Sequence, residues 1–372
     1  MSAGARHLYL HLPFCANRCG YCDFVTVVGR SGDHAAYVAA LLAELELERE
    51  HLAPDVETVF LGGGTPTFTD TTALERLLAA LPAAAEVTVE ANPETVTAEL
   101  ARMLREAGVN RVSLGVQSFQ PRLLEILDRV SGPDDVRGAV YRLRDAGFDN
   151  ISLDLIYGIP GQGPAELESD LAEALALEPE HLSAYELEAK PGTRFMHSHG
   201  AELGRQAESM ETYFEAVVET LIGAGYRWYE TANFCRLSTR GLRARDLRAL
   251  HNLGYWLGHD YLGLGVGAVS TIENRRWRNA PSLRGYLGRL AAGSPPPREV
   301  EELSPGVRET ERIMLGLRLD GPVAVGAAGG MLDPSGLRRL ERVGLARREN
   351  GAVWLTPRGR FLGDAVTATL LA

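Results

Sequence analysis

The chain has 372 residues, of which 45% are hydrophobic and 23% charged, and its formal net charge is −11. This composition is typical of a soluble globular protein with a large core, and the length predicts two or three domains. The negative charge argues against an extended nucleic-acid-binding surface. No secretory signal opens the chain, and the most apolar later stretch, 255–272, is interrupted by His259 and Asp260. We therefore expect no transmembrane segment and a location in the reducing cytoplasm.

In chain order, short β-type runs alternate with amphipathic helical stretches over about the first 230 residues. The predicted strands cover residues 7–13, 56–61, 86–91, 111–116, 150–156 and 181–187, and helices are predicted at 36–52, 72–81 and 164–177. This alternation predicts a parallel sheet covered by helices. Six βα units are too few for a closed eight-stranded barrel, so we predict an α/β fold with a partial (β/α)6 parallel barrel. Functional side chains of such folds gather after the C-terminal ends of strands.

The remainder of the chain predicts an α+β region in two parts. Residues 231–298 are rich in Arg, Gly, Tyr and Trp and predict irregular structure with short strands, ending in a Pro-rich linker at 293–297. Residues 299–372 predict helices near 308–319 and 335–343, a strand at 352–356 and a final helix, the order of a small winged-helix-like module. We favour a packing role for this module over DNA binding because the chain is acidic. The predicted domains are thus 1–230, 231–298 and 299–372.

Three of the four cysteines follow the first predicted strand with the spacing C-x3-C-x2-C. Cys15, Cys19 and Cys22 are close enough in one loop to bind three irons of a 4Fe-4S cluster, which leaves the fourth iron open to a small molecule. The alternative is structural zinc, which usually takes four protein ligands in paired short spacings. Here the fourth cysteine, Cys235, lies far along the chain, although His11 offers a fourth ligand. A disulfide framework is not expected in a long chain without an export signal.

Other predicted strand ends carry glycine or polar residues. A Gly-Gly-Gly-Thr-Pro turn at 62–66 follows the second strand, Glu90 lies near the end of the third, Gln117 and Arg129 follow the fourth, and Asp154 lies on the fifth. Glycines allow a backbone to approach a ligand closely, and the turn lacks the Gly-Lys-Ser/Thr of a P-loop. Any one of these residues alone is more often structural. Their recurrence at successive strand ends favours a ligand site.

Tyr21 completes the pattern C-x3-C-x-aromatic-C, and with it the loop resembles the radical SAM (S-adenosylmethionine) superfamily. The segments LYLHLPFCANRCGYCDF, FLGGGTPT, VEANPE, RVSLGVQSF, LDLIYGIPGQ and YETANF resemble the branch that contains oxygen-independent coproporphyrinogen III oxidases and heme chaperones of the HemW family. The resemblance implies a radical SAM barrel with a 4Fe-4S cluster on the three cysteines and SAM as its fourth ligand. It implies SAM contacts at Tyr9, Tyr21, Gly64, Thr65, Glu90, Gln117, Arg129 and Asp154.

Two features favour the chaperone family within this branch. Phe24 stands where the oxidase motif carries a fourth cysteine, and His251-Asn-Leu-Gly-Tyr255-Trp256 matches the H-N-x-x-Y-W motif of the chaperones. The resemblance implies heme as cargo with His251 as an iron ligand, delivery to apo-hemoproteins such as respiratory enzymes, and a reducing electron donor. Whether SAM is cleaved stays open. Coproporphyrinogen III oxidation is the main alternative function, and radical SAM methyl transfer ranks below it.

The stretch 236–250 departs from the family pattern because it is longer and rich in arginine. Its arginines are candidate partners of heme propionates, and they are Arg236, Arg240, Arg243, Arg245 and Arg248. From the residues alone, a His-Asn pair that caps a helix and a solvated basic face remain alternatives. Val269 also stands where the family usually carries His. The role of Cys235, a homodimer and a peripheral contact with a membrane are left open.

Overall fold

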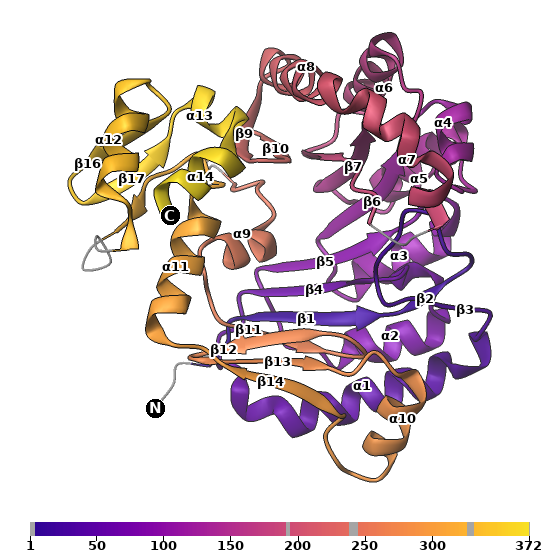
Figure 1. Cartoon of the computed structure of the whole chain (residues 1–372). Coiled ribbons are helices and arrows are strands. Elements are labelled where there is room, and N and C mark those ends of the chain that lie inside the picture. The colour runs from indigo at the N-terminus through magenta and orange to yellow at the C-terminus, as the bar shows by residue number, and fades with distance from the viewer. Residues whose placement is uncertain (1–3, 191–193, 238–244, 326–330, 372) are drawn as a thin grey trace.

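The computed structural model describes residues 4–190, 194–237, 245–325 and 331–371. Its main feature is one mixed sheet of twelve strands, ordered β14-β13-β12-β11-β1-β4-β5-β6-β7-β8-β10-β9 (Figure 1). Its central strands are parallel, and each pairs with the next one along the chain. They are β1 (His7–Leu12), β4 (Thr58–Gly63), β5 (Glu86–Ala91), β6 (Arg111–Gln117), β7 (Ile151–Tyr157) and β8 (His181–Glu186). This order is typical of a barrel wound in one direction and confirms the predicted α/β fold.

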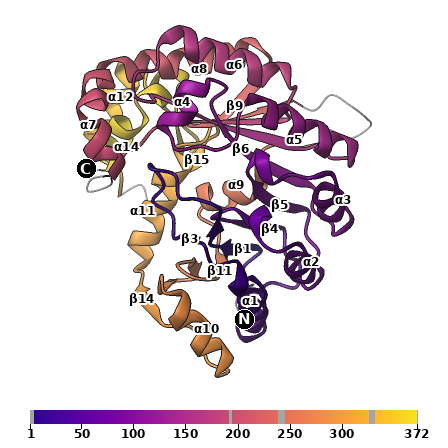
Figure 2. The same ribbon diagram turned by 90° about the vertical axis from the view of Figure 1, so that its right-hand side faces the viewer.

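Helices cover the outer face of the central strands, and Figure 2 shows them in an arc around the sheet. Several begin at a side-chain cap: Asp70 accepts the N–H of Ala73, and Thr97 accepts that of Leu100. Such a cap satisfies an N–H group that the first helical turn leaves without a partner. The helices before β9 are α1 (His34–Glu48), α2 (Thr71–Ala79), α3 (Ala98–Glu106), α4 (Pro121–Ile126), α5 (Pro133–Asp145), α6 (Pro164–Ala176), α7 (Arg194–Gln206) and α8 (Met210–Gly223).

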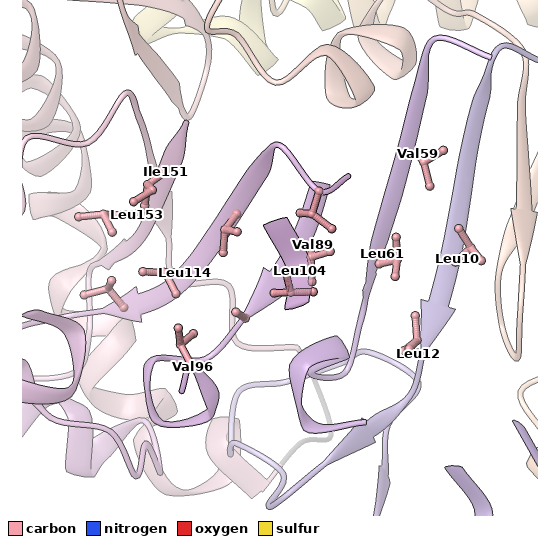
Figure 3. Close-up of a cluster of buried hydrophobic side chains, with 14 of the residues drawn as sticks. Leu10, Leu12, Val59, Leu61, Val89, Val96, Leu104, Leu114, Ile151 and Leu153 are labelled. Carbon is pink, nitrogen blue, oxygen red and sulfur yellow. The ribbon is translucent and has the colours of Figure 1, made fainter. Parts of the chain in front are cut away.

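Successive residues of each central strand face opposite sides of the sheet, as the two-residue repeat of a strand requires. Leu10 and Leu12 of β1 and Val59 and Leu61 of β4 are fully buried in the core, and Figure 3 shows them on neighbouring strands. The residues between them face the inner side of the sheet, and most are polar. They include His7, Tyr9, His11, Thr58, Glu86, Glu90, Arg111, Ser113, Ser152, Asp154, His181 and Ser183.

The region predicted as irregular adds strands to both edges of the central sheet. β11 (Tyr261–Leu264) pairs in parallel with β1, and β12 (Val269–Ile272), β13 (Arg275–Asn279) and β14 (Arg298–Glu302) continue it in antiparallel fashion. At the other edge, β10 (Asn233–Arg236) and β9 (Tyr226–Glu230) follow β8. The Arg-rich β13 lies opposite the Glu-rich β14, and such cross-strand charge pairs stabilise a sheet. Two helices complete the region, α9 (Leu250–Trp256) and α10 (Leu283–Ala291).

The C-terminal part forms a small module with its own hydrophobic core. It contains α11 (Pro305–Gly316), β15 (Val323–Ala324), α12 (Pro334–Arg342), β16 (Ala346–Glu349), β17 (Ala352–Leu355), α13 (Pro357–Phe361) and α14 (Gly363–Leu371), with the three strands in the order β15-β17-β16. The domain boundaries 1–230, 231–298 and 299–372 stay a prediction. β14 starts at residue 298 and extends past this boundary, yet it belongs to the main sheet. Among the described residues, no helix has the length and apolar character needed to cross a bilayer.

Candidate cofactor site

The cysteine loop leaves the carboxyl end of β1. After Pro13 the chain forms β2 (Phe14–Cys15), which pairs with β3 (Val27–Val28) and closes the loop between them. Cys15, Cys19 and Cys22 are free thiols, each half-buried, and all three line one cavity of about 420 Å³. The N–H of Cys22 donates to the carbonyl of Cys19 at 3.2 Å, so the loop is a compact turn. The topology thus presents three thiols to one hollow at the strand ends.

The glycine turn after β4 packs directly against this loop. The N–H of Gly64 donates to the Leu12 carbonyl and that of Thr65 to the Phe14 carbonyl, both at 2.8 Å. A Cβ atom at Gly64 would lie only 2.6 Å from the Pro13 carbonyl, so no other residue fits at this approach. Thr65 also donates its hydroxyl to the Cys15 sulfur at 3.7 Å. The turn therefore fixes the first cysteine of the loop.

A chain of polar side chains joins two of the thiols. Asn92 donates to the Thr65 hydroxyl at 3.0 Å and accepts from Arg129 at 2.9 Å. Arg129 also donates to the Gly115 carbonyl at 2.7 Å and to the Cys19 sulfur at 3.8 Å. Hydrogen bonds to cluster sulfurs tune the reduction potential of a cluster, so this hydrogen-bond network would affect any cluster held here. Asn92 lies in the segment VEANPE but was not predicted as a site residue, because its role depends on Arg129, which lies in the connection between α4 and α5.

Two half-buried carboxylates also line the cavity. Asp154 accepts hydrogen bonds from Ser113 at 2.9 Å and Ser152 at 3.3 Å, while Glu90 accepts the N–H of Gly63 at 3.1 Å. Burial, with a smaller contribution from the Asp154 charge, raises the pKa of Glu90 to about 7. Burial likewise raises the pKa of Asp154. A cationic ligand would relieve both effects, so this wall suits a molecule with positive charge.

Gln117 and Tyr21 complete the lining of the cavity. Gln117 adopts a left-handed backbone with φ 68°, at a point where the register of β6 and β7 shifts. A non-glycine residue in this conformation is strained, which is common where a strand presents a side chain to a ligand. The Tyr21 ring meets Phe195 edge to face at 6.4 Å. Of the predicted SAM contacts, only Tyr9 does not line this cavity.

Residues 9–174 match the radical SAM superfamily. The chain is 35% identical to the heme chaperone HemW of Bacillus subtilis, and the match covers 98% of both proteins. The chain belongs to the HemW family.

Other relatives agree with this assignment. The chain is 38% identical to the heme chaperone HemW of Mycobacterium tuberculosis H37Rv, covering 98% of this chain and 94% of the relative. It is 37% identical to HemW of Escherichia coli over 71% of this chain and 70% of the relative. Among solved structures, coproporphyrinogen III oxidase (HemN) from Escherichia coli superposes with a TM-score of 0.83 at 22% identity, covering 98% of this chain and 90% of that chain. This last likeness concerns the fold.

Membership of a radical SAM family implies a 4Fe-4S cluster and SAM, and the donor set here fits both groups. Three thiols from one loop line the same cavity as the carboxylates of Glu90 and Asp154 and the glycine turn. His11, the sequence alternative for a zinc site, is engaged elsewhere: its ring nitrogens bond to the Tyr9 hydroxyl at 3.0 Å and the Val25 carbonyl at 2.8 Å. Phe24, which replaces the oxidase's fourth cysteine, lines the cavity and is 61% exposed.

His251 lies at the other end of the central strands, away from the cysteines. One ring nitrogen bonds to the hydroxyl of Thr58, the first residue of β4, and the other to the Tyr255 hydroxyl, each at 2.8 Å. Thr58 in turn bonds to His7 at 2.8 Å. Burial lowers the pKa of His251 well below its usual value, so the imidazole is neutral. Tyr9 stands between the two ends, with its ring 6.4 Å from that of His251.

The described arginines of the 236–250 stretch are paired within the protein. Arg236 donates to the Tyr226 hydroxyl at 3.1 Å, Arg245 to Asp149 at 2.8 Å, and Arg248 to both oxygens of Asp246. Arg240 and Arg243 lie outside the described residues. Cys235 is buried on β10, and burial raises the pKa of its thiol to about 12, so it remains protonated.

Proposed function

We propose that this protein is a heme chaperone of the HemW type, which binds heme and delivers it to apo-hemoproteins. The observation that carries the proposal is identity of 35 to 38% to heme chaperones over nearly the full length of both proteins. The replacement of the oxidase's fourth cysteine by Phe24 and the motif that starts at His251 support the same assignment. The proposal includes acceptors such as respiratory enzymes, a reducing electron donor, and operation in the cytoplasm.

We further propose that Cys15, Cys19 and Cys22 hold the 4Fe-4S cluster and that SAM completes it. When bound, this pair of cofactors supplies one-electron reductive cleavage of SAM. The protein's own residues position the ligand: Glu90 and Asp154 offer negative charge, and the backbone of the glycine turn offers polar groups at close approach. Arg129 donates to the Cys19 sulfur and Thr65 to the Cys15 sulfur, so both side chains help to hold the cysteine loop in place.

For His251 we propose heme-iron ligation, which requires a local rearrangement. Because both ring nitrogens are hydrogen-bonded in this structure, the iron must displace either Tyr255 or Thr58 as the imidazole's partner. His251→Ala should therefore change the absorption spectrum of bound heme without reducing iron–sulfur content. His259→Ala is the matched control, since His259 bonds to His7 at 3.0 Å in the same cluster. An unchanged heme spectrum in His251→Ala would remove this residue from the heme site.

Transfer of heme is the direct test of the function. Anaerobically reconstituted protein loaded with heme should convert an apo-cytochrome to its holo form, measured by the cytochrome's absorbance after separation of the two proteins. The control supplies free heme at the same concentration. Loading of the acceptor from free heme should not depend on whether the chaperone is present. Loss of heme to bulk solution rather than to the acceptor would contradict a chaperone.

Coproporphyrinogen III oxidation is a second candidate because the fold matches that of HemN over 98% of this chain. Phe24 argues against it, since the side chain at this cavity position cannot act as a thiol. The same reconstituted protein, incubated with coproporphyrinogen III, SAM and reductant, should form no protoporphyrinogen IX. Multiple turnovers would assign the protein to the oxidases instead.

A further inference from the structure

A second cavity of about 730 Å³ lies between the main sheet and the C-terminal module. Its walls come from the carboxyl end of β8, the turn between β9 and β10, helices α8, α9 and α11, and the terminal helices α13 and α14. Much of the lining is apolar, including Phe214, Met314, Leu315 and Phe361. Cavities of this size bind small organic molecules and cofactors. None of the predicted cofactor residues lines it.

A buried cation without a full set of partners faces this cavity. Arg360 of α13 is 8% exposed, and its guanidinium carbon lies 3.6 Å from the centre of the Trp228 ring. Nη1 donates to the Trp228 carbonyl at 2.9 Å, whereas Nε and Nη2 have no hydrogen-bond partner among the described residues. Buried N–H groups without acceptors are costly, and an anion that accepts from these two nitrogens would remove that cost.

A second donor in the same wall is also unpaired. The indole Nε1 of Trp256, at the end of α9, is buried and has no acceptor within the described part of the chain. By contrast, Arg318 in this wall is already bonded to Glu230 at 2.7 Å and lies over the Trp256 ring at 4.7 Å. The cavity thus combines an apolar, aromatic interior with two donors that lack acceptors. This combination suits a ligand that has both a large apolar surface and oxygen atoms that accept hydrogen bonds.

The negative charges of the cavity lie on its exposed side. Glu186, Glu188 and Asp364 line the wall, and all three are exposed to solvent. Solvent screens their repulsion of an anion, while the buried Arg360 is not screened to the same degree. Burial lowers the pKa of Arg360 to about 10, so the group remains a cation at neutral pH. A ligand with a charged edge would therefore place that edge toward α13.

We propose that this second cavity is the site at which heme cargo is held, with a propionate carboxylate bound to Arg360. The inference rests on the proposed heme-chaperone function and names its binding site. Heme matches the cavity in size, in its large apolar face and in carrying carboxylates as acceptors. Tyr185, Glu186 and Glu188 line this cavity and also the cysteine cavity, so heme held here is adjacent to the cofactor site. His251 does not line it, so ligation of the same heme by His251 requires a movement of α9, which carries both His251 and the cavity residue Trp256.

The test compares heme with heme dimethyl ester, which lacks the free carboxylates. The full-length protein should bind heme about 10- to 100-fold more tightly than the ester, the range expected for a charge-assisted hydrogen bond in a buried site. Arg360→Gln should weaken heme binding to the level of the ester and leave ester binding unchanged. Arg358→Gln, an exposed arginine on the same helix, should keep the full preference. A merely structural role of Arg360 would not alter the preference between the two ligands.

A second variant tests the cavity without removing a buried group. Ala368→Trp adds volume from an exposed position of α14 that lines the cavity, and it should weaken heme and ester alike by at least tenfold. Tight heme binding that is unaffected by both Arg360→Gln and Ala368→Trp would overturn this site while leaving the chaperone function intact. A wild-type protein that binds neither heme nor its ester would instead reject the proposed function, and the site with it.

Discussion

At the scale of single residues, the cofactor site depends on hydrogen bonds to sulfur as much as on the sulfurs themselves. Thr65 and Arg129 each donate to one thiol, and Asn92 bonds to both donors. The cysteine spacing was readable from the sequence because all three residues lie in one loop. Asn92 was not, since its partners Thr65 and Arg129 lie in the connections that follow β4 and α4, and only the fold brings them together.

Removal of a proposed cluster ligand should abolish the cluster and spare the fold. Cys19→Ala should lose the brown absorbance and nearly all bound iron after anaerobic reconstitution, because a 4Fe-4S cluster with only two cysteine ligands is not retained. The stability of the cofactor-free protein should change by less than about 1 kcal/mol, as Cys19 is only half-buried. Cys235→Ala is the control and should bind iron normally. Full cluster loading in Cys19→Ala would show that another residue serves as the ligand.

Glu90 predicts a pH dependence of stability in the cofactor-free protein. Its pKa is raised from 4.5 to about 7, so between these values the folded state holds a proton that the unfolded state has released. Stability from this group is therefore complete below about pH 4.5 and is lost as the pH rises to 7. Glu90→Gln cannot ionise, so its stability relative to wild type should rise by about 3 kcal/mol between pH 4.5 and 8. The measurement is urea unfolding across this range.

Glu106→Gln, on the exposed surface of α3, serves as the control for Glu90 and should track the wild type at every pH. A constant difference between Glu90→Gln and wild type across the range would mean that Glu90 is already ionised in the folded protein. Bound SAM, which carries positive charge, should lower the pKa of Glu90 and so reduce the pH dependence.

At the scale of elements, the central strands were predictable because each carries its own local signal. The strand predicted at 86–91 is β5 itself, and the others differ from prediction by at most two residues at either end. β12 and β13 gave no such signal, since both are short additions to a sheet edge and β13 is rich in arginine. The central strands alternate apolar outer residues with polar inner ones. The inner face is polar because it meets a cavity and α9 rather than a packed core.

Helix α9 depends on a carboxylate that lies far away in the sequence. Its N-cap is Ala249, whose side chain cannot cap, and instead Glu86 of β5 accepts the N–H groups of Leu250 at 2.9 Å and His251 at 3.0 Å. Glu86→Ala should lower the free energy of unfolding by about 2–3 kcal/mol because two buried N–H groups lose their acceptor. Hydrogen exchange at these two amides should accelerate as well.

The matched control for this helix cap is Glu106→Ala, which removes a carboxylate from an exposed position of α3. It should leave both the free energy of unfolding and hydrogen exchange in α9 unchanged. If Glu86→Ala destabilised the protein without faster exchange in α9, the loss would arise in β5 and not at the helix. The same variant bears on function, because α9 carries both His251 and Trp256.

At the scale of the whole molecule, the sequence predicted the cysteine cavity but not the second cavity. The first is assembled from segments that follow successive strands, which the βα repeat places at one edge of the sheet. The second takes its walls from β8, α9, α11 and α14, which are separated by as much as half the chain. Their docking depends on tertiary contacts such as Arg227–Asp320 and Arg360–Trp228, which have no local sequence signature.

Because the two cavities share part of their lining, we can predict how each ligand affects amide hydrogen exchange. Cluster and SAM should slow hydrogen exchange in the cysteine loop, and heme should slow it in α14 and around Ala232, because bound ligand restricts the segments that line each cavity. The segment 185–188 lines both cavities, so either ligand should slow its exchange. In Arg360→Gln, protection of α14 should require about 10- to 100-fold more heme, while the effect of SAM on the loop persists. Protection of the cysteine loop by heme, with α14 unaffected, would place the cargo in the first cavity and make heme and SAM competitors.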